Sequence, residues 1–467
     1  MFLGCWKVCF KVGKKSLKDL ASAMRSTSII ITAVAWLAWS SELAASDPVN
    51  DQWAVFPLQS GAFEIHELHE VFLTVQYGSG EPDTIRHRDE EEKLLGRMSR
   101  NHGTWDSHHP RHRLLQALHG FSRYEERNMA ELNRWRGLYR HVSKKQKEVL
   151  EREVQYSGRF STVERLLKSN QGLCQAIVDN ALQFYRISNQ ELEKFIRDTE
   201  KSGSVAEKVS VGQSLKHFVR DWAESGIKER DPGFTCVLNT LDDLFPTQEN
   251  TNAIPKVMIP GAGLGRLGHE AAKLGFEVTI NEWSMYMNIA YRFLESHRER
   301  HSQTFYPFVD SWSHHASTND MIRPVSFPDV PINASSVVLV EGDFTTAFKD
   351  GTGTYDVVIT YFFIDTARNL VSYFDTIHLL LRPGGYWLNF GPLLYGTAPF
   401  VQLSLDEIVS VVESFGFQFL ETKDTCGDIT LPGKQVRGKE AIYGFNDRAL
   451  TKNAYNSQFW VAQKQHS

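Results

Sequence analysis

The chain has 467 residues, with 51 lysines and arginines against 56 aspartates and glutamates, so its formal net charge is -5. A surface that binds nucleic acid needs an excess of positive charge, and this composition therefore argues against a nucleic-acid partner. The length exceeds that of a usual single hydrophobic core, which predicts two structural units. The cysteines are scattered and form no CxxC pair, so the sequence suggests neither a structural zinc site nor a disulfide framework.

The first 46 residues differ in composition from the rest of the chain. Residues 1–25 are basic with a single acid, Asp19, and an apolar segment follows at residues 29–39. This pattern resembles a signal peptide, a weak anchor or an organellar presequence. The apolar run is shorter than the ~20 residues that a transmembrane helix needs, so membrane contact is expected only from an uncleaved anchor. We expect residues 1–46 to be a leader, with targeting and a misplaced start codon as open alternatives.

Residues 47–245 are predicted to be a mainly helical region. Polar runs predict that residues 47–110 are partly irregular. Between residues 111 and 195 the apolar side chains recur at helical spacing, which predicts three to five helices, and a further helix is predicted at about residues 215–225. One apolar face consists of Leu114, Leu115, Leu118 and Phe121.

Two histidine-rich stretches resemble metal sites at first sight. His66 and His69 are three residues apart, whereas the zinc-protease helix needs histidines four apart with the glutamate between them, so we expect a solvated helix face. The second stretch, interrupted by glycine and proline, is expected to lie at the surface. It comprises His102, His108, His109 and His112. We predict no metal site.

The most informative stretch is residues 256–284, KVMIPGAGLGRLGHEAAKLGFEVTINEWS. Its first apolar run, predicted as a strand, ends in Gly261, Gly263 and Gly265, after which a helix is expected. Glycines let the backbone turn sharply and approach a ligand without a clash from Cβ. A glycine turn between a strand and a helix is typical of a nucleotide-cofactor site.

A second predicted strand, at residues 276–280, is followed by Glu282, and an acid in this position can accept both hydroxyls of a ribose. Gly263, Gly265 and Gly268 nearly meet the dinucleotide spacing GxGxxG, so an NAD site must be weighed. The tightest cluster is GxGxG, however, which suits a sulfonium amino acid better than a pyrophosphate. No second glycine-rich unit follows, which also argues against a dinucleotide.

Downstream landmarks agree with this interpretation. The strand expected at residues 336–340 leads into Asp343 and Phe344, an acid–aromatic pair that could hold an adenine. Further strands are predicted at residues 355–363, 386–390, 417–423 and 458–463, with a helix at residues 370–381. Their order resembles the S-adenosylmethionine-dependent methyltransferase fold, in which a PGG turn leads into the fifth strand. We therefore expect an α/β, Rossmann-like seven-stranded methyltransferase sheet over residues 246–467.

The motifs PGAGLGRL, NEWS, GDF, FFIDTA and LRPGGYWLNFGPLLY together resemble the carnosine N-methyltransferase (N2227-like) family. The resemblance covers roughly residues 60–464. It implies methyl transfer from S-adenosyl-L-methionine to an imidazole nitrogen of carnosine, giving anserine, or of related histidine-containing di- and tripeptides. Protein-histidine or other small-molecule N-methylation and a non-catalytic cofactor-binding scaffold are the alternatives. The resemblance also suggests a homodimer and a cytoplasmic or nuclear location.

Carried over residue by residue, the resemblance implies a set of cofactor contacts. Glu282 would bind the ribose, Asp343 and Phe344 the adenine, and Arg220 the methionine carboxylate. His217 stands where the family has a glutamine and keeps the ability to hydrogen-bond. The other implied positions are the glycine turn with Gly261, Gly263 and Gly265, Val357 on the fourth strand, and Tyr361 near the methyl-transfer centre.

For the substrate, Asp365 and Tyr455 match positions of the family. A carboxylate at Asp365 would accept the N–H of the distal imidazole nitrogen and so turn the other nitrogen's lone pair toward the methyl group. The alternative role of Asp365 is an N-cap for a helix beginning near Arg368. Gly396 stands where the family places a histidine after GPLLY, which predicts an altered preference among histidine peptides.

Overall fold

A computed structural model describes residues 12–13, 70–71, 84–246, 254–396 and 398–466. The chain divides into two compact units, Met1–Ser79 and Gly80–Ser467. In the described part of the first unit, β1 (Val12–Gly13) pairs antiparallel with β2 (Glu70–Val71). The remainder of the predicted leader, together with His66 and His69, lies outside the described residues. All further elements belong to the second unit.

The helical region begins with a helix that the sequence pattern did not predict. α3 (Ile85–Arg97) lies in a segment that we expected to be partly irregular. The side chain of Thr84 caps it by accepting the backbone N–H of His87. His87 Nε2 lies 2.8 Å from the carbonyl oxygen of Val337 in the sheet, so α3 packs against the sheet edge. The sequence of α3 is dominated by charged residues, so no apolar periodicity indicated a helix.

The expected helices between residues 111 and 195 are confirmed. They are α4 (Pro110–Ser122), α5 (Tyr124–Tyr139), α6 (Lys144–Val154), α7 (Tyr156–Phe184) and α8 (Asn189–Lys201). His109 caps α4 and is buried, so the expectation that its histidine cluster lies at the surface is wrong for this residue. The apolar residues of α4 and α7 are buried along one side of each helix. This burial explains why the helical spacing of apolar residues predicted these helices.

Two helices lead from this region to the sheet. α9 (Val209–Trp222) corresponds to the helix expected at about residues 215–225, and a 3₁₀ turn, η2 (Glu224–Gly226), follows it. α10 (Ile227–Leu244) was not predicted and contains Pro232 within its first turns. Pro232 is the sixth residue of the helix, beyond the first turn in which proline is tolerated, and the helix nevertheless continues through it.

The structure contains the predicted α/β, Rossmann-like sheet. Its described strands run β11-β12-β13-β9-β8-β3-β4-β7, and β10 also pairs with β13. β7, β4, β3, β8 and β9 are parallel, whereas β13 is antiparallel to its neighbours. The strands are β3 (Lys256–Pro260), β4 (Glu277–Glu282), β7 (Val337–Glu341), β8 (Tyr355–Tyr361), β9 (Leu381–Gly391), β10 (Phe417–Leu420), β11 (Asp428–Ile429), β12 (Arg437–Ile442) and β13 (Ala454–Lys464). β11 and β12 thus extend the expected seven strands to nine.

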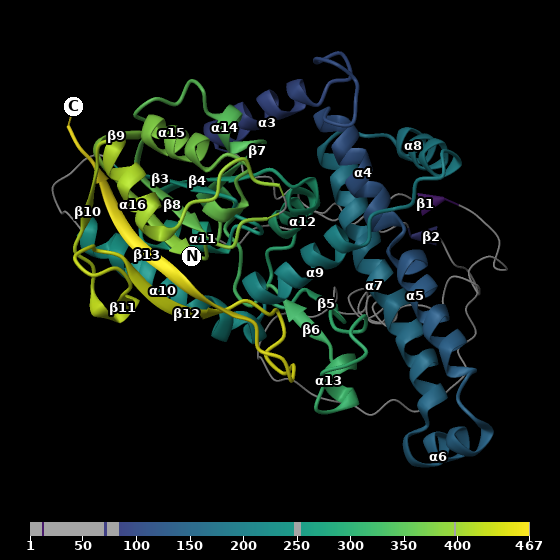
Figure 1. Ribbon diagram of the computed structural model, residues 1–467. Coiled ribbons are helices and arrows are strands. Elements are labelled where there is room, and N and C mark those ends of the chain that lie inside the picture. Colours follow the sequence, from purple (N-terminus) through teal and green to yellow (C-terminus); the bar gives the residue numbers. More distant parts are fainter. Residues whose placement is uncertain (1–11, 14–69, 72–83, 247–253, 397, 467) are drawn as a thin grey trace, which may run out of the picture. The chain divides into compact units, whose positions relative to one another are not determined.

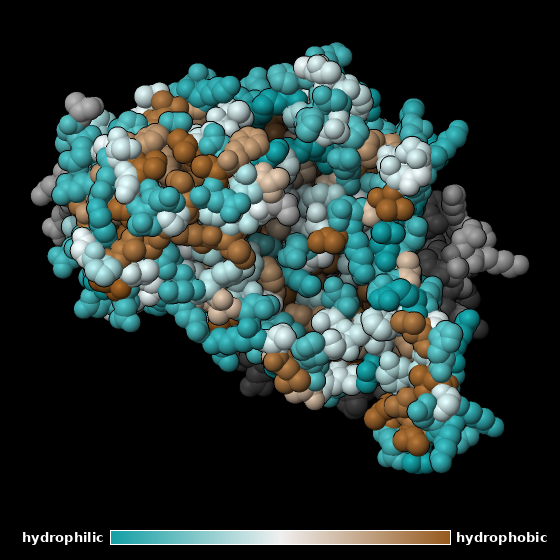
Figure 2. Space-filling model, viewed as in Figure 1, coloured by the Kyte–Doolittle hydropathy of each residue, from teal (hydrophilic) through white to brown (hydrophobic). Residues whose placement is uncertain are grey.

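Helices cover both faces of this sheet (Figure 1). Val257 and Ile259 of β3 belong to a core shared with α9 to α12, and Met258 belongs to a core shared with α15 and α16. This alternation follows from the two-residue period of a strand. Apolar residues gather over α15 and α16 on the face shown in Figure 2. The remaining elements are α11 (Arg266–Lys273), α12 (Met285–Ser296), α14 (Phe344–Ala347), α15 (Leu370–Leu380), α16 (Leu405–Ser414), and the small group β5 (Gln303–Phe305), α13 (Thr318–Ile322) and β6 (Val325–Phe327).

The helical region and the sheet share one hydrophobic core. Buried residues of α4 such as Leu114 belong to the same cluster as Ile280 of β4. Within the second unit, the helices before residue 246 and the sheet after it are therefore joined by continuous packing.

A disulfide between Cys236 and Cys426 links α10 to the segment before β11, with a Cα–Cα distance of 5.4 Å. The sequence suggested no disulfide framework, and a separation of 190 residues gave no sign of this pair.

Candidate active site

The glycine turn lies directly after β3. Gly261, Gly263 and Gly265 have φ angles of 62°, 57° and 73°, in the left-handed region that side chains rarely adopt. A Cβ atom at Gly261 would lie 2.2 Å from the ring of Phe363, and one at Gly265 would lie 2.6 Å from the ring of Tyr291. The turn therefore needs glycine for both its conformation and its close packing.

Glu282 ends the neighbouring strand β4 and faces this turn. Its Oε2 accepts the backbone N–H of Gly263 at 2.9 Å, and its Oε1 accepts the N–H of Ser284 at 2.8 Å. Burial raises the pKa of Glu282, and these backbone donors oppose that rise because they stabilise the carboxylate. An acid and a glycine turn are thus joined in one hydrogen-bonded unit.

A cavity of about 630 Å³ opens beside this unit. The residues that line it follow the carboxyl ends of β3, β4, β7 and β8, where ligands of open parallel sheets bind. They include Gly261, Glu282, Trp283, Asp343, Phe344 and Phe363. Asp343 caps α14 by accepting the N–H of Thr345 at 2.8 Å, and the side chain of Phe344 is buried. The cavity has the size and position of a nucleotide site.

Arg220 and His217 project from α9 toward the glycine turn. A Cβ atom at Gly263 would lie 3.2 Å from Nδ1 of His217 and 3.7 Å from Nη2 of Arg220. Arg220 donates through Nε to Asp221 at 2.7 Å, and its Nη2 lies 3.0 Å from Nδ1 of His217. Burial and the charge of Arg220 lower the pKa of His217, so its neutral ring accepts this hydrogen bond.

An aromatic cluster lies at the end of β8. The half-buried ring of Tyr361 stacks on Phe390, with centroids 5.5 Å apart and an angle of 12°. The next residue, Phe362, has φ 52° and stacks on Tyr443 at 5.1 Å. Tyr455 of β13 meets Phe362 edge-on at 6.1 Å. Positive φ in an aromatic residue is strained, and such strain gathers at functional sites.

Asp365 is buried in the 3₁₀ turn η4 (Ile364–Thr366) just beyond this cluster, and its Oδ2 accepts the N–H of Leu394 at 3.2 Å. Burial raises the pKa of Asp365 to about 6, although the bond from Leu394 opposes that rise. The N-cap of α15 is Asn369. The alternative that Asp365 caps this helix is therefore wrong, because the helix begins further along the chain.

Only four of the predicted site residues line this cavity: Gly261, Glu282, Asp343 and Phe344. The other nine lie outside its lining: His217, Arg220, Gly263, Gly265, Val357, Tyr361, Asp365, Gly396 and Tyr455. Val357 is fully buried in the middle of β8, where it pairs with Val257 and Tyr386. Gly396 is exposed in the segment after β9, and a Cβ atom placed on it would meet no atom within 4 Å. Val357 thus serves packing within the sheet, whereas Gly396 leaves open space.

Comparison of the sequence with known proteins identifies its family. The sequence model of the family described as carnosine N-methyltransferase matches residues 198–466, more than half of the chain. The chain belongs to the carnosine N-methyltransferase family. The family resemblance predicted from the motifs is thereby confirmed.

Carnosine N-methyltransferases from several organisms are similar to this family member along most of its length. The mouse protein (Mus musculus) is 29% identical over 364 residues, covering 76% of this chain and 86% of its own. The rat protein (Rattus norvegicus) is 29% identical over 432 residues, covering 90% and 97%. The protein of Schizosaccharomyces pombe is 30% identical over 330 residues, covering 66% and 83%.

Some residues of this site were missed by sequence reasoning. Arg113 of α4 donates to the carbonyl oxygen of Trp283 at 2.5 Å, and its guanidinium lies 3.7 Å from the centroid of the Trp283 ring. Burial lowers the pKa of Arg113, and the charges of Asp343 and Glu282 oppose that fall. Trp283 could have been found from its place beside Glu282 in NEWS. No sequence pattern indicated that Arg113 belongs to the site, because 170 residues separate it from Trp283.

Two negative findings complete the description. Among the described residues, no three or more histidine, cysteine, aspartate or glutamate side chains are arranged to hold a metal ion. Within the same residues, no helix has the length and apolar character needed to cross a membrane.

Proposed function

We propose that this member of the carnosine N-methyltransferase family methylates an imidazole nitrogen of carnosine, giving anserine, with S-adenosyl-L-methionine as the methyl donor. The observation that carries the proposal is the hydrogen-bonded unit of Gly263 and Glu282 beside a cavity at the carboxyl ends of the strands. Its class of reaction follows from the family to which the chain belongs.

The described residues fit this cofactor. The glycine turn packs closely against Phe363 and Tyr291, where a Cβ would clash, and the half-buried Glu282 presents an acceptor for the ribose hydroxyls. In this proposal Asp343 and Phe344 border the adenine, and Arg220, supported by His217, binds the methionine carboxylate. Val357 supports the site through packing beneath it. When bound, the cofactor supplies an electrophilic methyl group on a sulfonium sulfur.

The chain's own contribution is to position the imidazole. A free imidazole has a pKa near ~6.5, so at neutral pH it is mostly unprotonated and needs no strong base. With a pKa of about 6, Asp365 is mostly ionised at neutral pH and can accept the N–H of one ring nitrogen. The lone pair of the other nitrogen then points away from Asp365. Orientation of this kind supplies much of the rate gain in a displacement between two bound partners.

Aromatic side chains favour a planar substrate here. Tyr361 ends β8, Phe362 follows it directly, and Tyr455 lies against Phe362. We infer that Tyr455 contacts the substrate and that Tyr361 lies near the methyl-transfer centre. Gly396 removes an imidazole that the family resemblance places against the substrate, so a bulkier or differently charged histidine peptide would be preferred over carnosine.

A substrate panel tests the proposal. The full chain is incubated with methyl-labelled S-adenosylmethionine and carnosine, other histidine di- and tripeptides, free histidine, and a histidine-containing protein. Labelled methylhistidine in the small peptides is expected. Labelling of the protein alone would favour protein-histidine methylation, and cofactor binding without any transfer would favour the scaffold.

A homodimer and a cytoplasmic or nuclear location stay predictions, to be tested by light scattering and microscopy.

A further inference from the structure

A carboxylate near Arg220 is only half satisfied. Glu229, in the first turn of α10, accepts the backbone N–H groups of Phe445 at 2.8 Å and of Gly444 at 3.3 Å, both through Oε2. Its Oε1 is buried and has no hydrogen-bond partner among the described residues. A buried ionised oxygen without a partner is costly, so a donor is expected from outside the chain.

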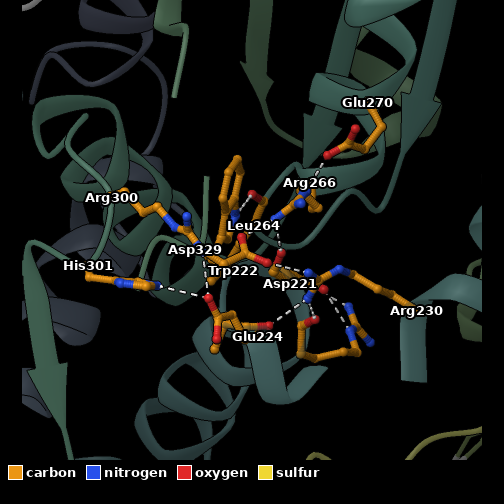
Figure 3. A network of polar contacts seen from close by, with 12 residues as sticks. Asp221, Trp222, Glu224, Arg230, Leu264, Arg266, Glu270, Arg300, His301 and Asp329 are labelled. Carbon is orange, nitrogen blue, oxygen red and sulfur yellow. Dashed lines mark hydrogen bonds and ion pairs between the residues drawn. The ribbon is translucent and has the colours of Figure 1, made fainter. Parts of the chain in front are cut away.

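Glu229 and Arg220 are held close together by the backbone around them. Arg230, the residue after Glu229, donates through Nη1 to the carbonyl oxygens of Arg220 at 2.9 Å and Ala223 at 2.8 Å. Its Nη2 binds Asp329. This network fixes the start of α10 against the end of α9, as Figure 3 shows for Arg230 and Asp329.

The same network reaches the helix that follows the glycine turn. Asp329 also accepts from Nη1 of Arg266 at 2.5 Å, and Arg266 is the first residue of α11. The buried aspartate therefore joins α10 to α11 (Figure 3). Because α9 carries Arg220, α10 carries Glu229 and α11 follows Gly265, these three features have fixed relative positions.

The charges of Arg220 and Glu229 both act on the side chain of Tyr361. Arg220, Asp221, Glu229 and Tyr443 all influence the buried hydroxyl of Tyr361, whose pKa burial raises. Burial raises the pKa of Glu229 too, and the charge of Arg220 opposes that rise. Glu229 is thus close enough to feel the charge of Arg220, the cation that lies beside Gly263.

Arg220 also has hydrogen-bonding capacity left. Its contacts within the described residues use Nε and Nη2, and none uses Nη1. An α-amino acid carries a carboxylate and an ammonium on one carbon atom. A cation and an anion, each with a free polar atom, match such a zwitterion.

We propose that Oε1 of Glu229 accepts a hydrogen bond from the α-ammonium group of the methionine portion of S-adenosylmethionine, while Arg220 holds the carboxylate. This inference rests on the proposed function, since it assumes that cofactor. The amine of a carnosine-like peptide has the same chemistry. The cofactor is favoured because Arg220 lies beside Gly263 of the cofactor turn.

Binding measurements test the inference without turnover. S-adenosylhomocysteine keeps the α-ammonium, and its deaminated analogue replaces that group by hydrogen. Calorimetry on the full unmodified chain should show the analogue binding at least about tenfold more weakly, the loss typical of a hydrogen bond to a charged group. In Glu229→Gln, S-adenosylhomocysteine should weaken at least about tenfold, and the difference between the two ligands should largely disappear.

Glu229→Gln keeps an acceptor for the N–H groups of Phe445 and Gly444, so the local fold is retained. The matched control is Glu224→Gln, since Glu224 is exposed and pairs with Arg300 and His301. This control should bind both ligands as the unmodified chain does.

Four outcomes would overturn the inference. Equal weakening of both ligands by Glu229→Gln would show that Glu229 only supports the local fold. Unchanged S-adenosylhomocysteine affinity with a raised KM for carnosine would assign the ammonium to the peptide. Should the variant not fold, equal binding of the two ligands to the unmodified chain would refute the idea by itself. If the unmodified chain bound neither ligand, the proposed function would fail as well, which separates the two failures.

Discussion

The backbone N–H of Gly263 donates a hydrogen bond to Oε2 of Glu282 at 2.9 Å, which ties the turn after β3 to the acid at the end of β4. The turn cannot shift without affecting the acid, and the acid cannot rotate freely toward solvent. Preorganisation of this kind reduces the ordering that a ligand would otherwise require. The predictions below follow from this and neighbouring contacts.

Replacing Glu282 should weaken cofactor binding. Glu282→Ala removes the proposed acceptor of the ribose hydroxyls and leaves the N–H of Gly263 without its partner. Hydrogen bonds to charged groups are worth ~1.5–3 kcal/mol each, so affinity for S-adenosylmethionine should fall at least about tenfold in calorimetry. Glu277→Gln is the control, because Glu277 begins the same strand and pairs with Arg86 and Lys256. An unchanged affinity in Glu282→Ala would refute the ribose assignment.

The strands around this site were predictable from sequence, and some helices were not. Strands buried on both faces read as continuous apolar runs, which located β3, β4, β7 and β8 closely. α10 was missed because charged residues and Pro232 crowd its first turns, and only tertiary packing reveals its buried face. The role of Asp365 as an N-cap was wrong because a 3₁₀ turn, which has no distinct sequence pattern, delays the helix.

Contacts between distant segments were beyond sequence reasoning. Arg113 reaches Trp283 because the helical region and the sheet share a core, a fact that no local pattern encodes. Glu229 likewise lay within a stretch that matched the family, but its free oxygen depends on the loop that contains Phe445. Motifs identified the acid and glycine positions, whereas the partners of those residues required the fold.

Arg113 should support cofactor binding from the helical region. Arg113→Met keeps an apolar stem over Trp283 but removes the charge facing Glu282 and Asp343. Loss of one hydrogen bond and one cation–π contact, ~1–2 kcal/mol together, should weaken S-adenosylhomocysteine about 5- to 30-fold in calorimetry. Arg134→Met is the matched control, since Arg134 covers Trp135 on α5. If both variants bind the ligand equally well, Arg113 has only a packing role.

Asp365 should cost stability in the free protein at neutral pH. Its folded-state pKa of about 6 lies above the ordinary value of 3.8. Because the folded state favours the protonated form, its contribution is most favourable below pH ~4 and is lost as the pH rises through ~6. Asp365→Asn should therefore raise the free energy of unfolding above pH 6 by about 2 kcal/mol, and by little at pH 4.

Denaturation of both proteins at several pH values measures this difference, with the exposed Asp350→Asn as control. In the same variant turnover should fall far more than S-adenosylmethionine affinity, since orientation of the imidazole acts on the transition state. A pH-independent stability difference would contradict the burial effect. Turnover close to that of the unmodified chain would contradict the substrate role.

Gly396 should set the preference among histidine peptides. Its exposed position has no atom within 4 Å of an added Cβ, and its φ lies outside the left-handed region, so a side chain fits without strain. Gly396→His would restore the imidazole that the family resemblance places beside the substrate. Carnosine kcat/KM should rise severalfold relative to larger histidine peptides, because one added hydrogen bond contributes ~0.5–1.5 kcal/mol. Gly137→His, at an equally open glycine of α5, should change nothing. If carnosine is already the best substrate and Gly396→His is neutral or harmful, another residue holds the peptide and Gly396 does not determine specificity.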